Sequence, residues 1–299
     1  MKTLLLVDPI PAAPFIEAVR AIAPDVEMLA FRADLSEAEL ASVEAVLAWR
    51  IPPDLAGRLP RLRWVCSVAA GVEKLLVPGL PAEVPVSRIV DTEQAEGIAQ
   101  FVVMMALRHA RDLPTYEAQQ RERAWRRQPV TTARHRVAVL GTGTMGGAIA
   151  RLMSAVGFSV TGWSRSVGGP LETLLAASDL LVCALPLTPQ TEGILNARRL
   201  ALLPRGAYVI NIARGAHVVE PDLIAAVRSG QLAGAALDVQ CNEPMASDDP
   251  LWSVPGITIT PHIAAQSHPA TIAAQFVAGL RQVAQGAPPP QLVDRERGY

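Results

Sequence analysis

Three segments of the chain place a reactive side chain directly after a predicted buried strand. Arg214 follows the apolar run 207–212, Glu243 follows the run 234–239, and His262 follows the run 257–260. In an open α/β sheet the carboxyl ends of the strands line the ligand crevice. We therefore expect these three side chains to lie at one edge of one sheet, around a single site.

The residue types suit proton transfer to a carbonyl oxygen of a small acidic substrate. His262 would be the general acid, because imidazole titrates near working pH. Arg214 would bind the carboxylate and polarise the carbonyl, as a bidentate cation can. Taken singly, each residue also has an ordinary structural or surface explanation, so the prediction depends on their joint occurrence.

A glycine pattern indicates a phosphate-binding loop. Gly141, Gly143 and Gly146 form GxGxxG between the predicted strand 137–140 and the predicted helix 145–156, with Thr144 and Met145 inside the loop. Such glycines permit a tight turn, close approach of the backbone to a pyrophosphate, and close packing of helix on strand. Glycines also serve ordinary turns, but the strand before and the helix after are the context that dinucleotide binding requires.

The end of the next strand indicates which dinucleotide is used. Trp163, Ser164, Arg165 and Ser166 lie where an NAD site carries an acid for the ribose 2′-hydroxyl, and no acid is present. Arginine offers a planar, charge-assisted fork to a 2′-phosphate. We expect NADPH to be preferred, with NADH possible. The alternative is an exposed arginine at a strand end.

Composition limits the classes of function. The chain has 299 residues, is 50% hydrophobic and 18% charged, and carries a net charge of -1. These values disfavour disorder and nucleic-acid binding. The three cysteines, Cys66, Cys183 and Cys241, lie far apart, so we expect no metal site and a reducing cytoplasm. Cys66 and Cys183 should be buried core residues. No stretch is apolar enough to span a membrane.

Two series of alternating strands and helices position these residues. The first contains predicted strands at 4–7, 45–49 and 64–68 and helices at 15–22 and 37–41. A helix at 93–116, which Pro114 would kink or end, and an Arg- and Gln-rich segment at 117–136 follow. We expect that segment to be a solvated surface or a subunit contact. The second series has strands at 137–140, 160–163, 180–185, 207–212, 234–239 and 257–260, and a helix from 268 to 284. This alternation predicts two open parallel sheets.

The motifs resemble those of the D-2-hydroxyacid dehydrogenase family. Matching segments are the glycine loop, 185–191, 211–215, 238–244, 250–252 and 261–262, and the resemblance covers nearly the whole chain. Segments 163–166, 215–220 and 293–299 are most similar to the bacterial glyoxylate/hydroxypyruvate reductases of the A type. The resemblance implies an α/β fold of two doubly wound parallel-sheet domains. A flavodoxin-like substrate domain would span 1–96 and 272–299, and a Rossmann nucleotide-binding domain would span 97–271.

The resemblance also assigns roles to individual residues. Glu243 would orient the ring of His262, and Asp238 would lie beside the nicotinamide. Further cofactor contacts would come from Leu185, Pro186, Thr191, Ile212 and Ala213. In the first domain, the backbone of Ala69, Ala70, Gly71 and Val72 would bind the substrate carboxylate, although Ala69 stands where a second glycine is common. Arg50 could add a cation there or be surface-exposed. A homodimer formed through the helix near 93–116 and the segment after it is also implied.

Other functions remain open at this point. The same fold could oxidise phosphoglycerate, D-lactate or phosphonate; formate is disfavoured because the motifs of that branch are missing. The absence of a regulatory domain after Tyr299 argues against the long form of phosphoglycerate dehydrogenase. A nucleotide-sensing scaffold, like the family's transcriptional corepressors, is a non-enzymatic alternative that the Arg214, Glu243 and His262 set disfavours.

Overall fold

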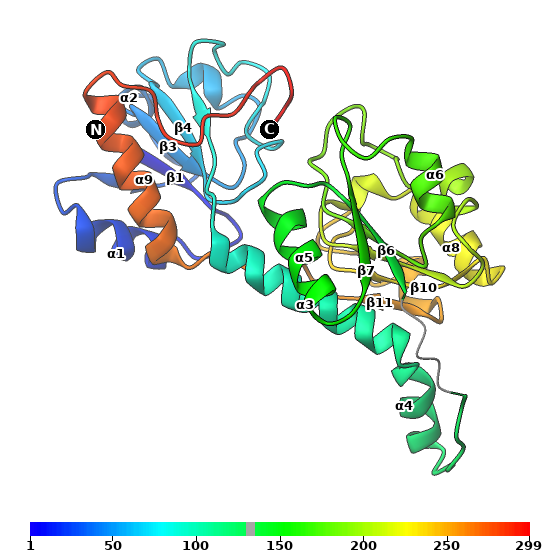
Figure 1. Cartoon of the computed structure of the whole chain (residues 1–299). Coiled ribbons are helices and arrows are strands. Elements are labelled where there is room, and N and C mark those ends of the chain that lie inside the picture. The colour runs from blue at the N-terminus through cyan, green and yellow to red at the C-terminus, as the bar shows by residue number, and fades with distance from the viewer. Residues whose placement is uncertain (130–134) are drawn as a thin grey trace. The chain divides into compact units, whose positions relative to one another are not determined.

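The computed structural model describes residues 1–129 and 135–299. The chain divides into two compact units (Figure 1): unit 1 comprises Met1–Asp91 and Ser267–Tyr299, and unit 2 comprises Thr92–Gln266. The expected boundaries, 96/97 and 271/272, lie five residues further along the chain. The units divide where helix α3 begins, so this helix belongs entirely to unit 2.

Unit 1 is a five-stranded parallel sheet with helices on both faces. Its elements are β1 (Thr3–Leu6), α1 (Ala13–Ile22), β2 (Met28–Ala30), α2 (Glu37–Ala41), β3 (Ala45–Ala48), β4 (Trp64–Ser67), β5 (Val86–Ser87) and α9 (Pro269–Ala284). The strand order is β2-β1-β3-β4-β5, which is the flavodoxin-like order. The sequence pattern did not predict β2 and β5, because runs of three and two residues carry too little periodicity.

The alternation of side chains along β1 explains the two faces of this sheet. Leu4 and Leu6 pack in the core that includes Leu40 of α2, whereas Leu5 packs in the core under α1 and α9. Successive side chains of a strand point to opposite faces, so a continuous apolar run is buried on both. The stacked rings of Trp64 and Phe276, 5.1 Å apart, join the sheet to α9.

Unit 2 is a six-stranded parallel sheet. Its elements are α3 (Thr92–Ala110), α4 (Leu113–Arg121), β6 (Arg136–Leu140), α5 (Thr144–Ala155), β7 (Ser159–Trp163), α6 (Leu171–Ala176), β8 (Leu180–Cys183), α7 (Ala197–Leu200), β9 (Ala207–Asn211), α8 (Glu220–Arg228), β10 (Leu232–Leu237) and β11 (Ile257–Ile259). The strand order is β11-β10-β9-β8-β6-β7. One core lies under α3 and α5, and the other lies under α6 and α8.

This strand order creates a switch point beside β6. The chain leaves β6 to form β7 on one side and then returns to form β8 on the other side of β6. In open α/β sheets, ligands bind outside the carboxyl ends of the strands at such a point. The glycine loop therefore lies where the topology itself favours a bound ligand.

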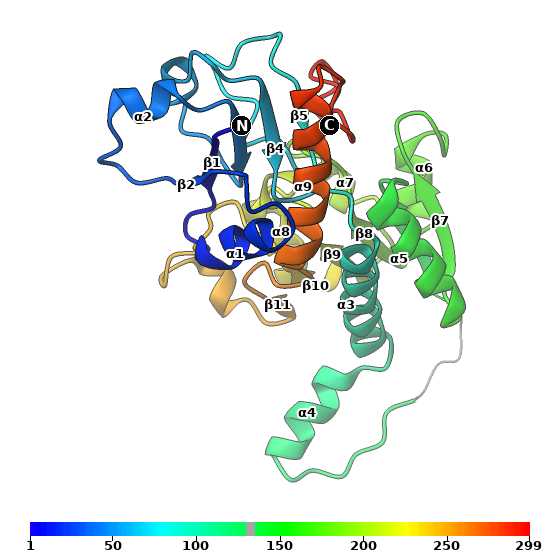
Figure 2. The same ribbon diagram turned by 90° about the vertical axis from the view of Figure 1, so that its left-hand side faces the viewer.

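The helix expected at 93–116, with a kink or an end at Pro114, is two helices in the structure, separated at Arg111 and Asp112. Asp112 adopts a left-handed conformation with φ 49°, which aspartate tolerates better than most residues. Pro114 lies in the first turn of α4, where its missing N–H costs nothing. Helix α4 projects away from the rest of unit 2 (Figures 1 and 2). Of the segment 117–136, residues 130–134 lie outside the described residues.

Two cysteines lie in the cores as predicted. Cys66 is 2% exposed and Cys183 is fully buried, and burial raises the pKa of each thiol to about 12. Such thiols stay protonated and act as small apolar side chains. Among the described residues, no helix has the length and apolar character needed to cross a membrane.

Candidate active site

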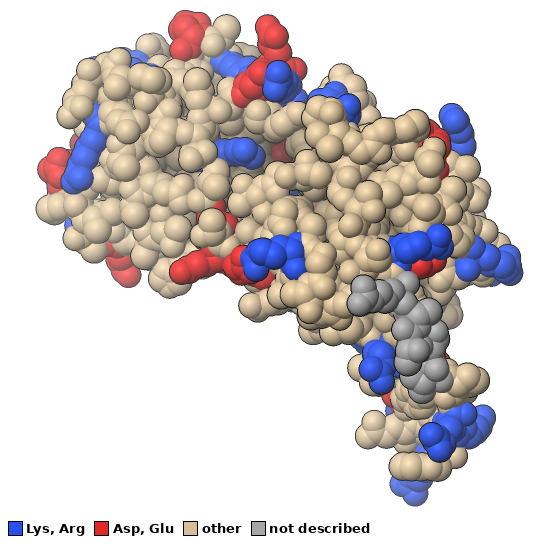
Figure 3. All heavy atoms as spheres, viewed as in Figure 1, with Lys and Arg blue, Asp and Glu red and all other residues tan. Residues whose placement is uncertain are grey.

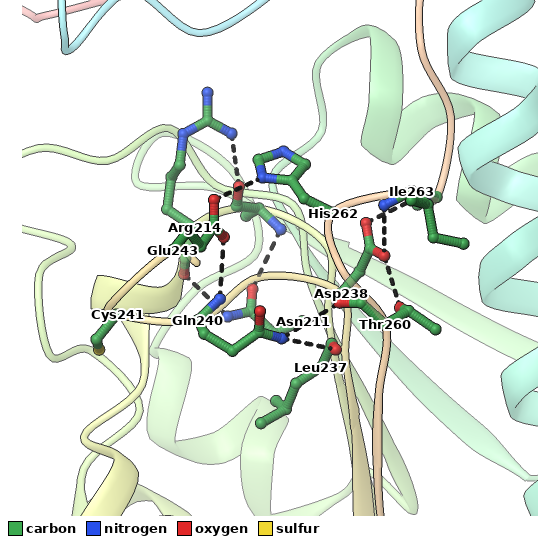
Figure 4. A network of polar contacts seen from close by, with 12 residues as sticks. Asn211, Arg214, Leu237, Asp238, Gln240, Cys241, Glu243, Thr260, His262 and Ile263 are labelled. Atoms are coloured by element: carbon green, nitrogen blue, oxygen red, sulfur yellow. Dashed lines mark hydrogen bonds and ion pairs between the residues drawn. The ribbon is translucent and has the colours of Figure 1, made fainter. Parts of the chain in front are cut away.

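The structure brings Arg214, Glu243 and His262 together at the carboxyl edge of three adjacent strands (Figure 4). Arg214 follows β9, Glu243 lies in the loop after β10, and His262 follows β11. The register pairs β9 with β10 and β10 with β11 in parallel, so their carboxyl ends emerge side by side. The expectation of one cluster at one edge agrees with this arrangement.

His262 and Glu243 form a direct pair. Nδ1 of His262 lies 2.9 Å from Oε2 of Glu243, and the two side chains are 32% and 28% exposed. The other carboxylate oxygen of Glu243 accepts a hydrogen bond from the backbone N–H of Gln240, at 3.1 Å. Both oxygens of the carboxylate are therefore engaged, and one of them orients the imidazole.

The backbone of His262 is left-handed, with φ 56°. A non-glycine residue in this region costs of the order of 1 kcal/mol or more, so surrounding bonds must hold it there. The N–H of His262 donates to the carbonyl oxygen of Asp238 at 2.8 Å. The carboxylate of Asp238 accepts from the Thr260 hydroxyl at 2.6 Å and from the N–H groups of Ile263 and Ala264, each at 2.9 Å.

Asp238 thus holds the loop that carries His262 in place. It is 1% exposed, and its carboxylate accepts hydrogen bonds on both oxygens from that loop. A buried carboxylate is tolerated only when such bonds replace its hydration. The contact predicted between Asp238 and the nicotinamide stays a prediction; the bonds described here give this residue a positioning role.

The loop of Arg214 is held from both sides. The Asn211 side chain donates to the carbonyl oxygen of Arg214 at 2.9 Å and accepts from the N–H of Ala213 at 3.1 Å. Gly215 packs so tightly that an added Cβ would lie 1.9 Å from the carbonyl carbon of Gln240. The guanidinium of Arg214 donates to the carbonyl oxygen of Ala213 at 2.6 Å. This close backbone approach brings the loop of Arg214 against the loop of Glu243.

The glycine loop has the geometry that a dinucleotide requires. Gly141 has φ 102°, and a Cβ there would lie 2.4 Å from the carbonyl oxygen of Ala184. A Cβ on Gly146 would lie 1.7 Å from the carbonyl oxygen of Gly141, whereas a Cβ on Gly143 would meet nothing within 4 Å. Helix α5 begins without an acidic side chain in its first turn. An open face at Gly143 and a helix N-terminus favour an anion, so these residues fit a pyrophosphate.

The turn after β7 contains the predicted cofactor-selecting residues. The backbones of Ser164 and Val167 close it with reciprocal hydrogen bonds of 2.8 and 3.1 Å. Arg165 is exposed, and its guanidinium lies 3.5 Å from Oε1 of Gln190. The hydroxyls of Ser164 and Ser166 are 3.2 Å apart. The indole of Trp163 is instead buried and donates to the carbonyl oxygen of Gly169 at 2.9 Å, so a cofactor contact from Trp163 would come from its backbone.

The other predicted cofactor residues follow β8 and β9 at the carboxyl edge of the same sheet. The Thr191 hydroxyl donates to the carbonyl oxygen of Pro186 at 2.7 Å and accepts from the N–H of Thr188 at 2.8 Å, which closes the loop after β8. The side chains of Leu185, Ile212 and Ala213 are 7%, 9% and 7% exposed. Their contact with a cofactor stays a prediction.

In unit 1, the predicted substrate loop is organised by Ser67, which sequence reasoning missed. Its buried hydroxyl donates to the carbonyl oxygen of Gly71 at 2.8 Å and accepts from the N–H of Ala69 at 3.0 Å. The side chain of Val72 is buried in the core. Arg50 is 61% exposed and lies 3.5 Å from Asp8, a weak surface pair.

Sequence reasoning also missed the supporting residues of unit 2. Asn211 and Gln240 appeared only as parts of motifs, yet both are buried. The Asn211 side chain donates to the carbonyl oxygen of Arg214, and the Gln240 side chain donates to that of Thr260. An amide side chain at or just after the end of a strand is the sequence feature that could have indicated this supporting role. Cys241, beside this site, has a pKa raised to about 12 by partial burial and by Glu220, which argues against a reactive thiolate. No cluster of three potential metal ligands occurs among the described residues.

Comparison with known proteins identifies the family of this chain. Residues 103–264 match the family model for the NAD-binding domain of D-isomer specific 2-hydroxyacid dehydrogenases. The chain is 39% identical over 273 residues to glyoxylate/hydroxypyruvate reductase A of Yersinia enterocolitica, covering 85% of this chain and 87% of that protein. The reductase A of Serratia proteamaculans is 38% identical, with 85% and 87% covered.

Two solved structures have the same fold over the full length. A D-isomer specific 2-hydroxyacid dehydrogenase of Xanthobacter autotrophicus, in complex with NADPH, has a TM-score of 0.91 at 39% identity, covering 100% of this chain and 99% of that one. An NADPH-dependent glyoxylate/hydroxypyruvate reductase of Sinorhizobium meliloti has a TM-score of 0.89 at 32% identity, with 100% and 99% covered. The family expected from the motifs is confirmed: the chain belongs to the D-isomer specific 2-hydroxyacid dehydrogenases, which are NAD(P)-dependent oxidoreductases.

Proposed function

We propose that the protein is an NADPH-preferring reductase of short 2-oxo acids, with glyoxylate and hydroxypyruvate as its substrates. The observation that carries this proposal is the pair of His262 and Glu243, 2.9 Å apart, beside Arg214 at one sheet edge. A proton donor and a cation for a carboxylate are what reduction of a 2-oxo acid needs. The relatives named glyoxylate/hydroxypyruvate reductase A support the choice of substrate.

The chain's own residues would perform the proton chemistry. The bound dinucleotide supplies the hydride. Nδ1–H of His262 donates to Glu243, so Nε2 is the nitrogen that delivers a proton to the substrate oxygen. After transfer, the ring is neutral and keeps its proton on Nδ1, held by the same carboxylate. Arg214 binds the substrate carboxylate and stabilises negative charge on the reacting oxygen.

The residues of the glycine loop and of the turn after β7 would hold the cofactor. Gly143 presents an open backbone to the pyrophosphate at the start of α5. Arg165, with Ser164 and Ser166, would bind the 2′-phosphate, and the neighbours in complex with NADPH or NADP support this choice. In unit 1, we propose the backbone of Ala69, Ala70, Gly71 and Val72 as a carboxylate contact, and Arg50 as an additional cation.

A substrate panel tests this function. The purified protein is assayed with glyoxylate, hydroxypyruvate, pyruvate and a longer 2-oxo acid, each with NADPH and with NADH. We expect kcat/KM to be highest for glyoxylate or hydroxypyruvate with NADPH. A higher value for pyruvate or for the longer acid would refute the proposed substrate, and a preference for NADH would refute the proposed cofactor.

We also propose a homodimer formed through α3, α4 and the segment after them. Four large apolar side chains of these segments are exposed: Met104, Leu107, Leu113 and Trp125 are 52%, 38%, 46% and 97% exposed. Positive charge lies at the end of α4 and on the described residues after it (Figure 3), from Arg121, Arg123, Arg126 and Arg127. Light scattering should give twice the chain mass for the wild type and a smaller mass for Met104→Asp; equal masses would refute this interface.

The three free cysteines suit a reducing compartment, and we propose a cytoplasmic location. Fractionation of cells that produce the protein with an intact N-terminus tests this, because recovery in the periplasm would contradict it.

A further inference from the structure

His217 is a buried histidine that the proposed chemistry does not use. It is 0% exposed and lies in the single turn Gly215–His217, directly after Arg214. Its Nδ1 lies 3.2 Å from the backbone nitrogen of Arg214, and its Nε2 lies 3.3 Å from the carbonyl oxygen of Pro186. The ring therefore touches two loops: the one that carries Arg214 and the one that follows β8.

The bonds of these loops determine where the ring proton lies. The N–H of Arg214 points at Nδ1 and needs an acceptor there. The carbonyl oxygen of Pro186 needs a donor, which Nε2–H supplies. The alternative, Nδ1–H donating to the carbonyl oxygen of Arg214 at 3.0 Å, would turn the lone pair of Nε2 toward the Pro186 oxygen. That oxygen of Arg214 already accepts from the Asn211 side chain and from the N–H of His217. The neutral ring with its proton on Nε2 satisfies the most groups.

We propose that His217, neutral and protonated on Nε2, is a positioning residue that ties Arg214 to the predicted cofactor loop of Pro186. This inference rests on the proposed function. The carbonyl oxygen of Pro186 also accepts from Thr191, so a shift of the ring disturbs the closed loop 186–191. On its other side, the turn of His217 packs against Gln240 through Gly215. The ring thus links the backbone of Arg214 to the carbonyl oxygen of Pro186, the two loops proposed to bind substrate and cofactor.

Two substitutions separate the two bonds of the ring. His217→Asn places an amide oxygen near the position of Nδ1, so it can accept from Arg214 while losing the bond to Pro186. His217→Gln places an amide nitrogen near the position of Nε2, so it can donate to Pro186 while losing the bond to Arg214. The loss of one buried hydrogen bond changes a binding or rate constant by roughly tenfold.

The expected results differ between the two variants. His217→Asn should raise the Kd of NADPH, measured by fluorescence, about tenfold and leave the KM of the 2-oxo acid within about twofold of the wild type. His217→Gln should leave the Kd of NADPH unchanged and lower kcat/KM for the 2-oxo acid about tenfold. Equal effects of both variants on both quantities would indicate a merely structural role and overturn the proposal, as would no effect of either.

A measurement on the wild type covers the case in which a variant does not fold. Nitrogen-15 spectra of histidine-labelled protein report the tautomer of each ring, and we expect the proton of His217 on Nε2. A proton on Nδ1, or a charged ring at neutral pH, would overturn the proposal. The tautomer and the NADPH affinity do not depend on turnover. A wild type that binds NADPH and reduces no 2-oxo acid would refute the proposed function and leave the bond from His217 to Pro186 testable.

Discussion

Two regions of unit 2 serve the same proposed reaction but differ in burial. They are the carboxyl edge of β9, β10 and β11, and the turn after β7. At the first, buried polar groups hold the backbone on every side: Asp238 is 1% exposed and Asn211 is 0% exposed. At the second, Arg165 is exposed and its guanidinium lies 3.5 Å from Gln190. The first region depends on buried hydrogen bonds, and the second on an exposed positive charge.

The difference follows from what each region must do. Proton transfer needs a donor that is held in place, and the buried hydrogen bonds around the backbone of His262 provide this. Recognition of a phosphate needs a cation that can reach it, and an exposed arginine does so at little cost in the free protein. We therefore expect substitutions in the network to damage both activity and stability, and substitutions in the turn to change cofactor choice alone.

The largest effect should come from removing the proposed acid. His262→Ala leaves Glu243 in place and removes the group that delivers the proton, so kcat should fall by roughly 10²- to 10⁴-fold. Steady-state assays with glyoxylate and NADPH measure this. The circular dichroism spectrum and the affinity for NADPH should stay close to those of the wild type. Turnover near the wild-type value would remove His262 from the mechanism.

The next largest effect should come from Asp238, whose carboxylate holds the backbone that carries His262. Asp238→Asn replaces one accepting oxygen with an NH₂ group that faces the N–H groups of the His262 loop. Loss of buried bonds to a charged group should lower the free energy of unfolding by about 2–3 kcal/mol and also lower kcat. Urea unfolding and kinetics check both. Asp248→Asn, at an exposed position, is the matched control and should change neither.

The half-buried His109, also in unit 2, gives a prediction for the dependence of stability on pH. His109 stacks on Tyr208 with ring centroids 4.3 Å apart, and burial, then the charge of His135, lowers its pKa to about 4; Asp112 acts in the opposite direction. The unfolded chain binds more protons between pH 6.5 and 4, so stability is lost as pH falls through that window. The loss between pH 7 and pH 5 should be about 2 kcal/mol. His109→Phe should reduce the loss in urea unfolding; an unchanged pH profile would contradict this assignment.

The smallest effect should come from the exposed turn. Arg165→Ala removes the cation proposed for the 2′-phosphate, so kcat/KM with NADPH should fall roughly tenfold while the value with NADH stays the same. The unfolding midpoint should not move, because the side chain is exposed. Arg198→Ala, another exposed arginine of unit 2, controls for a general loss of positive charge. Equal losses with both cofactors would show that Arg165 does not select between them.

Much of the fold could be predicted from the sequence because it depends on local patterns. Continuous apolar runs predicted β1, β3, β4, β6 and β8, and the glycine spacing predicted the turn between β6 and α5. Pro114 predicted a kink or an end of the helix expected at 93–116, but the sequence did not show that the break lies two residues earlier, at the left-handed Asp112. The two shortest strands, β2 and β5, depend on partners that are distant in the chain.

The sequence by itself determined which residues could do chemistry: Arg214, Glu243 and His262, each after a strand, and a glycine loop before a helix. Only the tertiary structure decided what holds them. Asp238 reaches the backbone of Ala264, 26 residues away, and His217 reaches Pro186, 31 residues away. A residue's type and its distance from a strand end are local properties of the chain. A hydrogen bond between two loops exists only after parallel strands have brought those loops to the same edge.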